Sequence, residues 1–326
     1  MAHRRIVATA AAVALVVLRS ATASAQAFLP SQGEGSVSVL YQNTLVDRHV
    51  LSDGSRLDAG QIRADGVMVD FTYGLTDHAA ISMNVPFLAA KYTGSRPHPA
   101  SALDDGQYHS ALQDFRFDLR YKLGTGSMAI TPFVGTILPS HDYAYYGHGA
   151  VGRDVKELQV GVSAARVLDP LIPGAFVQAR YAYGFAEKIL DVSHNRSVMD
   201  VEIGYFVNPR LRGFVIATGQ ITHGGIDLTH QFPLDLTAAE FLHHDQFARA
   251  NLFDAGGGAQ VSVSPSLDLF ASVVHTFWGI NGHALEYSAT AGASWSFRAG
   301  SLIGSHASRS LHKCLCEKAS VNVPMQ

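Results

Sequence analysis

The sequence carries little charge and, after its first eighteen residues, no long hydrophobic run. Asp, Glu, Lys and Arg make up 16% of the 326 residues, below the roughly 25% of ordinary soluble domains. No later window offers the about 20 uncharged apolar residues that a transmembrane helix needs. Yet 47% of the residues are hydrophobic and the mean hydropathy is +0.10. These values exclude a disordered chain and a bundle of membrane helices.

Cysteine is nearly absent: Cys314 and Cys316 both lie near the C-terminus. The fold of the remaining chain therefore does not depend on disulfides. The formal net charge of −3 gives no reason to expect nucleic acid as a partner.

The N-terminus has the three parts of a secretory signal peptide. Arg4 and Arg5 precede an apolar stretch at 6–18, and Ala23-Ser24-Ala25 matches an A-x-A cleavage site. We predict a signal peptide over residues 1–25, and hence export.

Apolar and polar residues alternate with a period of two in most of the chain. Between residues 114 and 122, one face carries Phe115, Phe117, Leu119 and Tyr121 and the other carries Asp114, Arg116, Asp118, Arg120 and Lys122. Successive side chains of a strand point to opposite faces, so this pattern predicts a strand with one apolar and one charged face.

The alternation recurs along the whole chain. It is strong at 67–73, 81–87, 175–183, 199–205 and 287–297, and weaker near 35–45, 128–138, 155–167, 211–222, 249–263 and 267–278. Short connections with Gly, Pro, Asp or Asn alternate with mostly longer ones at 46–61, 90–110, 139–154, 186–195 and 223–248, with a brief one at 279–283. Short turns at one end and longer loops at the other are typical of outer-membrane barrels.

A soluble β-sandwich also alternates, so the alternation alone leaves two folds open. Strands of about ten residues exceed the usual five or six of soluble sheets. Aromatic residues also gather at the ends of the apolar faces, as interfacial girdles do: Tyr73, Tyr121, Tyr205, Phe87, Tyr183, Phe277 and Trp278. We therefore predict an all-β fold, a transmembrane antiparallel up-and-down β-barrel of about 12 strands, over residues 26–297, followed by a C-terminal tail over 298–326.

The polar faces of such a barrel line its interior. The candidate pore-lining residues are Asp70, Asp114, Arg116, Asp118, Arg120, Lys122, Gln178, Arg180, Asp200, Glu202, Gln260 and Asp268. They have two interpretations: a polar pathway that orients a small solute by charge, or a structural network of inward charges that pair across the lumen.

The long segment 226–247 has two interpretations as well. Its apolar residues are Phe232, Pro233, Leu234, Leu236, Phe241 and Leu242. Either they fold inward as a constriction, or they pack on the barrel rim. Four nearby histidines, His223, His230, His243 and His244, lack convincing ligand spacing. His306 and His312 beside Cys314 and Cys316 are a slightly better metal candidate, but solvated histidines are the simpler interpretation of both groups. We predict no metal site and no cofactor.

The sequence does not indicate an enzyme. It has no Gly-x-Ser-x-Gly elbow, no phosphate-binding glycine loop and no zincin motif. Outer-membrane phospholipases and deacylases resemble each other in using a His-x-Ser near the barrel wall. The His-x-Ser of this chain, His306-Ala307-Ser308, lies beyond the last strand.

Two resemblances add to this interpretation. Residues 290–297, with Gly292, Trp295 and Phe297, resemble the last-strand assembly signal of bacterial outer-membrane proteins, although residues 298–326 follow. This resemblance implies the barrel assembly machinery as a partner. Segments 73–77, 81–87, 114–121, 131–140 and 152–153 are together similar to the MetA-pathway phenol-degradation family. That family comprises exported bacterial barrels thought to be outer-membrane transporters, some encoded near aromatic-degradation pathways.

The sequence thus favours an outer-membrane channel for the passive passage of small molecules, with aromatic or otherwise hydrophobic compounds as candidates. Its partners are outer-membrane lipid and the small-molecule solute. A non-conducting barrel with a structural or surface-binding role is the alternative, and a lipid-modifying enzyme comes third.

Overall fold

The computed structural model describes residues 27–299 except 59, 95–97, 99–100, 125–127, 232–234 and 236. The signal peptide predicted over 1–25 and nearly all of the tail predicted over 298–326 lie outside these residues.

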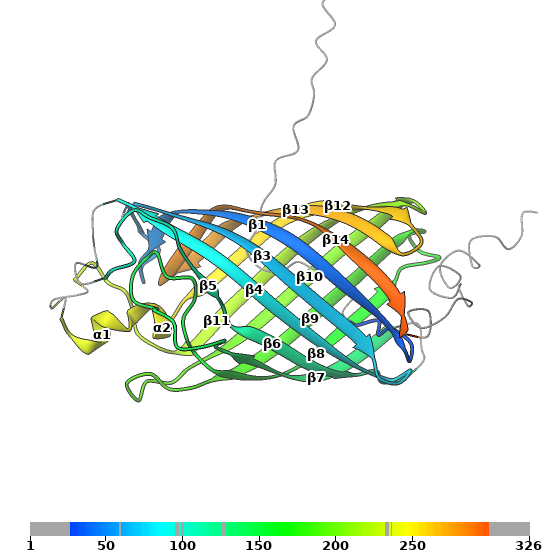
Figure 1. Ribbon diagram of the computed structural model, residues 1–326, viewed down its shortest axis with the longest axis horizontal. Helices are drawn as coiled ribbons and strands as arrows, with labels where there is room; N and C mark the ends of the chain where they lie inside the picture. The colour runs from blue at the N-terminus through cyan, green and yellow to red at the C-terminus, as the bar shows by residue number, and fades with distance from the viewer. Residues whose placement is uncertain are drawn as a thin grey trace, which may run out of the picture.

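The described chain forms one closed antiparallel barrel of twelve long strands (Figure 1). The strands are β1 (Glu34–Val50), β3 (Gln61–Gly74), β4 (Ala79–Thr93), β6 (Phe115–Tyr121), β7 (Met128–Leu138), β8 (Glu157–Val167), β9 (Ala175–Ala186), β10 (His194–Asn208), β11 (Leu211–Gly224), β12 (Asn251–Ser264), β13 (Leu267–Ile280) and β14 (Gly282–Arg298). Each pairs with the next, and β14 pairs with β1 to close the barrel. The predicted fold class and strand number are confirmed.

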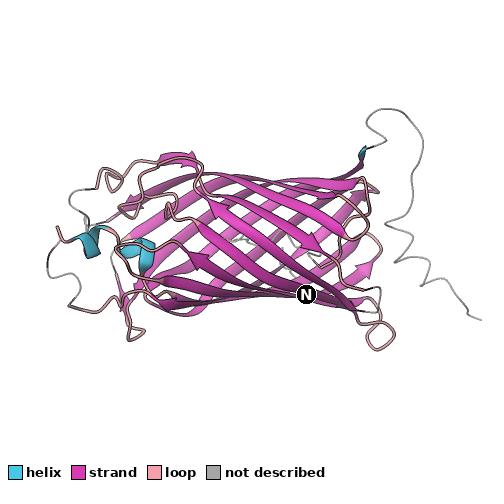
Figure 2. Cartoon of the chain, turned by 90° about the horizontal axis from the view of Figure 1, so that it is seen from below, coloured by secondary structure: helices cyan, strands magenta, loops and turns pink. Residues whose placement is uncertain are grey.

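Connections of two lengths stand at the two ends of the barrel. The short turns include 75–78 and 209–210. Glu34 at the start of β1 pairs with Arg298 at the end of β14, so the first strand begins and the last strand ends at the short-turn end of the barrel. The longer connections contain β2 (Arg56–Leu57), β5 (His109–Leu112), α1 (Ala239–Leu242) and α2 (His244–Phe247), and Figure 2 shows both helices at one end of the barrel. Neither helix among the described residues is long and apolar enough to cross a membrane.

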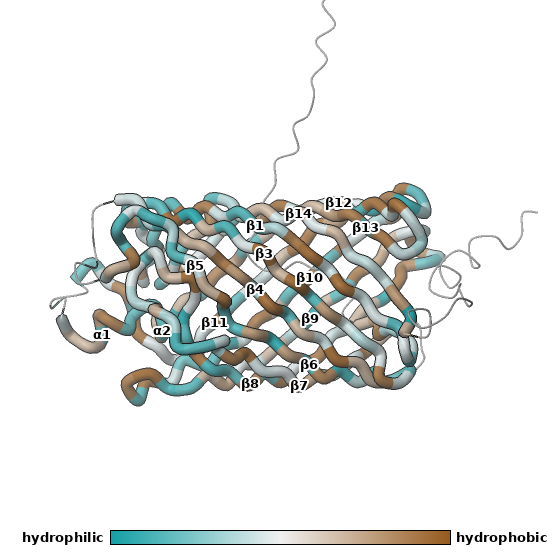
Figure 3. The backbone as a smooth tube through the Cα atoms, in the orientation of Figure 1, coloured by the Kyte–Doolittle hydropathy of each residue, from teal (hydrophilic) through white to brown (hydrophobic). Residues whose placement is uncertain are grey.

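The two faces of each strand separate as the alternation predicts. Large apolar side chains cover the exterior, among them Val69, Phe117, Leu119, Val134, Met199 and Val215. Figure 3 shows hydrophobic residues recurring along the strands, while hydrophilic residues gather in the loops beside α2. Tyr121, Tyr205, Phe87, Phe277 and Trp278 are exposed on the outside. The exterior therefore matches the apolar band and aromatic girdles of a barrel in lipid.

An aromatic cluster spans the seam where β14 meets β1. The Phe297 ring lies 6.3 Å from the Phe71 ring and 6.5 Å from the Tyr73 ring, both on β3. It crosses β1 at Gly35, where a Cβ would stand 2.8 Å from the Phe297 ring. Glycine at position 35 thus lets the ring reach across an entire strand. Trp295, on the same outer face, packs against Phe297 with ring centroids 5.9 Å apart. At Gly292 a Cβ would stand 2.7 Å from the Phe270 ring, so glycine leaves room for that ring.

Phe297→Ala is expected to weaken the closed barrel more than a matched change elsewhere. Each lost aromatic pair costs about 0.5–1.5 kcal/mol beyond the buried area, and here the pairs join the first and last strands. Phe277→Ala is the control, because Phe277 is 63% exposed at the opposite end of the barrel. Unfolding temperature in detergent, followed by the shift in gel migration on boiling, measures the difference. Equal midpoints for the two variants would contradict a stabilising role for the seam cluster.

Candidate functional site

The interior of the barrel holds a cavity of about 350 Å³. All twelve long strands contribute to its lining, from Ser38 on β1 to Leu285 on β14. Most of the charged lining residues lie on β6, β9 and β10. This cavity is therefore the lumen of the barrel.

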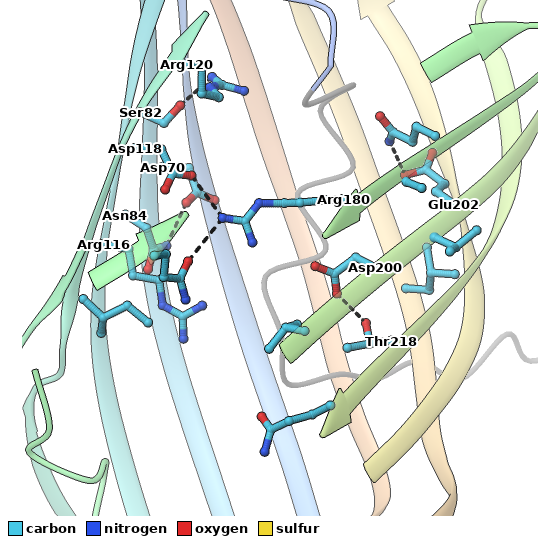
Figure 4. A pocket seen from close by; sticks show the side chains of 18 of the residues that line it. Asp70, Ser82, Asn84, Arg116, Asp118, Arg120, Arg180, Asp200, Glu202 and Thr218 are labelled. Atoms are coloured by element: carbon cyan, nitrogen blue, oxygen red, sulfur yellow. Dashed lines mark hydrogen bonds and ion pairs between the residues drawn. The ribbon is translucent and has the colours of Figure 1, made fainter. Parts of the chain in front are cut away.

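Arg180 extends into this lumen from β9. Its guanidinium lies 3.5 Å from a carboxylate oxygen of Asp118 on β6 and donates to Gln159 Oε1 on β8 at 3.3 Å. Its Cζ atom stands 4.1 Å from the centroid of the Phe133 ring. Figure 4 shows Arg180 reaching toward Asp118. Arg180 and Asp118 therefore form a charged bridge over the two intervening strands, β7 and β8.

A second ion pair lies closer to the short turns. Arg212 Nη1 is 3.3 Å from Glu202 Oε1, and the two side chains are only 10% and 6% exposed. Gln178 donates to the other Glu202 oxygen at 2.9 Å, and Arg212 donates to Gln260 at 2.8 Å. The Arg212 guanidinium also stands 5.4 Å from the Phe176 ring. Each charge is thus compensated, as burial of a charge requires.

Other lumen carboxylates accept hydrogen bonds from neutral groups. Asn84 donates to Asp70 at 2.7 Å, Thr218 donates to Asp200 at 2.8 Å and Thr276 donates to Asp254 at 2.7 Å. In each pair the partners stand on adjacent strands, so strand register alone brings them together.

The structure places the candidate pore-lining residues in different positions. Eight border the lumen: Asp70, Arg116, Asp118, Arg120, Gln178, Arg180, Asp200 and Glu202. Gln260 reaches the site through Arg212. Asp114, Lys122 and Asp268 are not among the described residues that line it. Lys122 follows β6 at the short-turn end, where its N–H bonds to His78, and Asp268 accepts a hydrogen bond from Ser262.

Asp114 lies at the loop end, where it accepts a hydrogen bond from the Tyr143 hydroxyl. Burial raises the pKa of Asp114 above its usual range, and the hydrogen bond from Tyr143 and the charge of Arg116 oppose that shift. Burial also raises the pKa of Tyr143, to which the Asp114 charge adds. Asp114 therefore anchors a loop.

Glu157 and Arg196 are lumen residues that the sequence analysis missed. They form an ion pair between β8 and β10, with the Arg196 Nε donating at 2.7 Å. Arg196 has the same strand phase as Asp200 and Glu202, so extending that alternation toward the N-terminus would have found it.

A second cavity of about 350 Å³ lies at the loop end of the lumen. Asn84 and Arg116 border both cavities, so they stand where one passes into the other. Its remaining lining combines strand residues with Tyr145, His148 and Asp245 from the loops. The long loops therefore cover the lumen at this end.

The described residues of segments 94–114, 139–156 and 225–250 pack together, and we call them the loop assembly. Phe241 and Phe247 are 4% and 0% exposed. Gln246 and Arg153 each donate to the main-chain carbonyl of the other, at 2.7 and 3.2 Å. The apolar residues of 226–247 that the structure describes thus pack within the loop assembly. Phe232, Pro233, Leu234 and Leu236 lie outside the described residues.

The four loop histidines singled out in the sequence lie apart. His223 bonds to Ser197 and His230 to Ser55, while His243 stacks on Tyr145. Only His244 joins a larger group of histidines, contributed by other segments.

Comparison with known proteins shows the fold. The chain is similar to the COG4313 outer membrane channel from Pseudomonas putida F1, with 15% identity, a TM-score of 0.63 and coverage of 82% of this chain and 97% of that chain. It is also similar to the NanC porin (11% identity, 79% and 98% coverage, TM-score 0.46) and to the translocator domain of autotransporter NalP from Neisseria meningitidis (11%, 82% and 90%, 0.45). No protein-family model and no curated protein matches the sequence. The fold is that of the outer-membrane β-barrels.

Proposed function

We propose that this protein is an outer-membrane channel for the passive passage of small molecules. The observation that carries the proposal is a charged lumen that all twelve strands line and that continues into a second cavity past Arg116. The apolar exterior and the signal peptide predicted over 1–25 support a place in the outer membrane. The similar Pseudomonas putida protein is an outer membrane channel, which supports the proposal further.

We further propose that aromatic acids are among the solutes. A guanidinium binds carboxylates and stacks on aromatic faces, and Arg116, Arg120 and Arg180 present guanidinium groups to the lumen. The Arg180 group already lies over Phe133 and beside Asp118, so a bound carboxylate would compete with Asp118 for it. The resemblance to the MetA-pathway phenol-degradation family supports the same class of solute.

Conductance in planar bilayers and uptake into liposomes test the channel. We expect discrete conductance steps from purified protein, and faster uptake of benzoate than of a neutral sugar of similar size. Absence of both conductance and uptake would refute the channel. That result would favour the non-conducting barrel, whose lumen the closely packed loop assembly would close. Equal uptake of benzoate and sugar would refute only the proposed solute class.

Arg180→Gln is expected to raise the ionic conductance and to remove the preference for benzoate. The substitution shortens a side chain that projects into the lumen and removes its positive charge. Arg63→Gln is the control, because Arg63 is exposed on the outer face of β3. Unchanged conductance and solute preference in Arg180→Gln would place the solute path elsewhere.

A further inference from the structure

Five histidines and two aspartates from separate segments meet inside the loop assembly and at the strand ends beneath it. His49 is the penultimate residue of β1 and His283 is the second residue of β14. The others come from the three loops: His98, Asp104, His148, His244 and Asp245. They form overlapping groups whose potential ligand atoms lie within 4.8 Å of one another. His148, Asp245 and His283 border the second cavity, but the channel proposal assigns none of these side chains a role in binding the solute.

Three imidazoles form the centre of this group. His49 and His283 are paired across the seam of the barrel, and their ring centroids are 4.3 Å apart. The Nε2 atom of His148 approaches Nε2 of His49 to 2.6 Å. The ring of His148 also lies 5.5 Å from that of His283. One loop and both seam strands thus supply one nitrogen donor each.

A buried carboxylate faces Nδ1 of His148. Asp104 Oδ2 lies 3.8 Å from His148 Nδ1 and 2.8 Å from His98 Nδ1. The other carboxylate oxygen accepts a hydrogen bond from the Gly149 N–H at 3.0 Å, and the Asp104 side chain is fully buried. A carboxylate facing Nδ1 leaves Nε2 to point at the ligand position, as in many histidine-bound metal sites.

Buried nitrogens in this group lack hydrogen-bond partners. Nδ1 of His49 and Nδ1 of His148 are both buried, and neither makes a hydrogen bond within the described chain. An unsatisfied buried polar atom costs about 1–3 kcal/mol. A metal ion on Nε2 would leave the proton on Nδ1, and in His148 that proton would face Asp104 at 3.8 Å.

We propose that His49, His148 and His283 bind a transition-metal ion of the zinc type. Three imidazoles suit Zn²⁺, Cu²⁺ or Ni²⁺ rather than Mg²⁺ or Ca²⁺, which prefer oxygen ligands. Asp245 stands 4.0 Å from Nε2 of His283 and is placed to approach the fourth position. In a tetrahedral zinc site, ligand nitrogens are roughly 3.3 Å apart, so the rings of His49 and His148 must separate slightly as the ion enters. The ion would tie the loop at 139–156 to the two strands that close the barrel.

Zinc titration of the full-length protein in detergent, without a polyhistidine tag, tests the site. All variants carry Cys314→Ser and Cys316→Ser, which removes the thiols as competing ligands. We expect one equivalent of tightly bound Zn²⁺ that is lost in His148→Ala and in His49→Ala. His230→Ala is the matched control, because His230 is exposed in the loop at 225–250. Asp104→Asn should weaken binding by about 10–100-fold if the carboxylate positions His148.

Heat-modifiable gel migration, measured without metal, establishes that each variant is folded. A folded His148→Ala or His49→Ala protein that keeps the zinc equivalent would overturn the proposal. So would a background protein that binds no zinc. Co²⁺ gives a second readout, since its visible bands should report tetrahedral nitrogen ligands in the control and disappear in His148→Ala. These outcomes do not depend on conductance, so the metal site and the channel fail or stand separately.

Discussion

Phe117→Arg is expected to destabilise the assembled barrel by about 2–4 kcal/mol, because it places a cation on the lipid-facing surface near the bilayer midplane. Phe117 is 38% exposed on the outer face of β6, between Met83 and Thr136 on the flanking strands. The measurement is the free energy of unfolding in lipid vesicles, together with the folded fraction on unboiled gels.

Arg116→Phe is the matched variant, one residue away on the opposite face. Arg116 borders both lumen cavities, so the assembled fraction should change less than in Phe117→Arg and the conductance should change more. A similar loss of assembly at both positions would contradict the assignment of the two faces.

Glu202→Ala is expected to cost about 3–5 kcal/mol of stability, because it leaves the buried Arg212 charge without its carboxylate. The remaining contact to Gln260 is to a neutral group and cannot replace the ion pair. Unfolding in vesicles by denaturant measures the loss.

The double variant Glu202→Ala/Arg212→Met is the control for this prediction. It removes both charges, so much of the lost stability should return. If the double variant is as unstable as Glu202→Ala, the loss comes from packing rather than from an uncompensated charge.

The strands and their faces were predictable because alternation is a local property. Phe117 and Arg116 show it directly: adjacent residues take opposite faces of a strand whatever the rest of the fold does. The pairing of strands in sequence order followed from the short turns and the closed sheet.

The partners within the lumen were not predictable in the same way. Asp118 and Arg180 stand on β6 and β9, with two strands between them, and their contact depends on the size of the barrel and the stagger of its strands. Asp114 continued the alternation of β6 but lies just before it, bonded to a loop tyrosine. The histidine group combines residues from five separate segments, and no spacing in the sequence indicates that these segments meet.

Thiol blocking of conductance at two positions on β11 tests the central claim that solutes pass through the barrel interior. In a Cys314→Ser/Cys316→Ser background, Thr218→Cys places a thiol in the lumen beside Asp200, and Val215→Cys places one on the outer face, where Val215 is 57% exposed. We predict that a membrane-impermeant thiol reagent lowers the conductance of the Thr218→Cys channel and leaves that of Val215→Cys unchanged. No block at position 218, or an equal block at both positions, would contradict a pathway through the lumen.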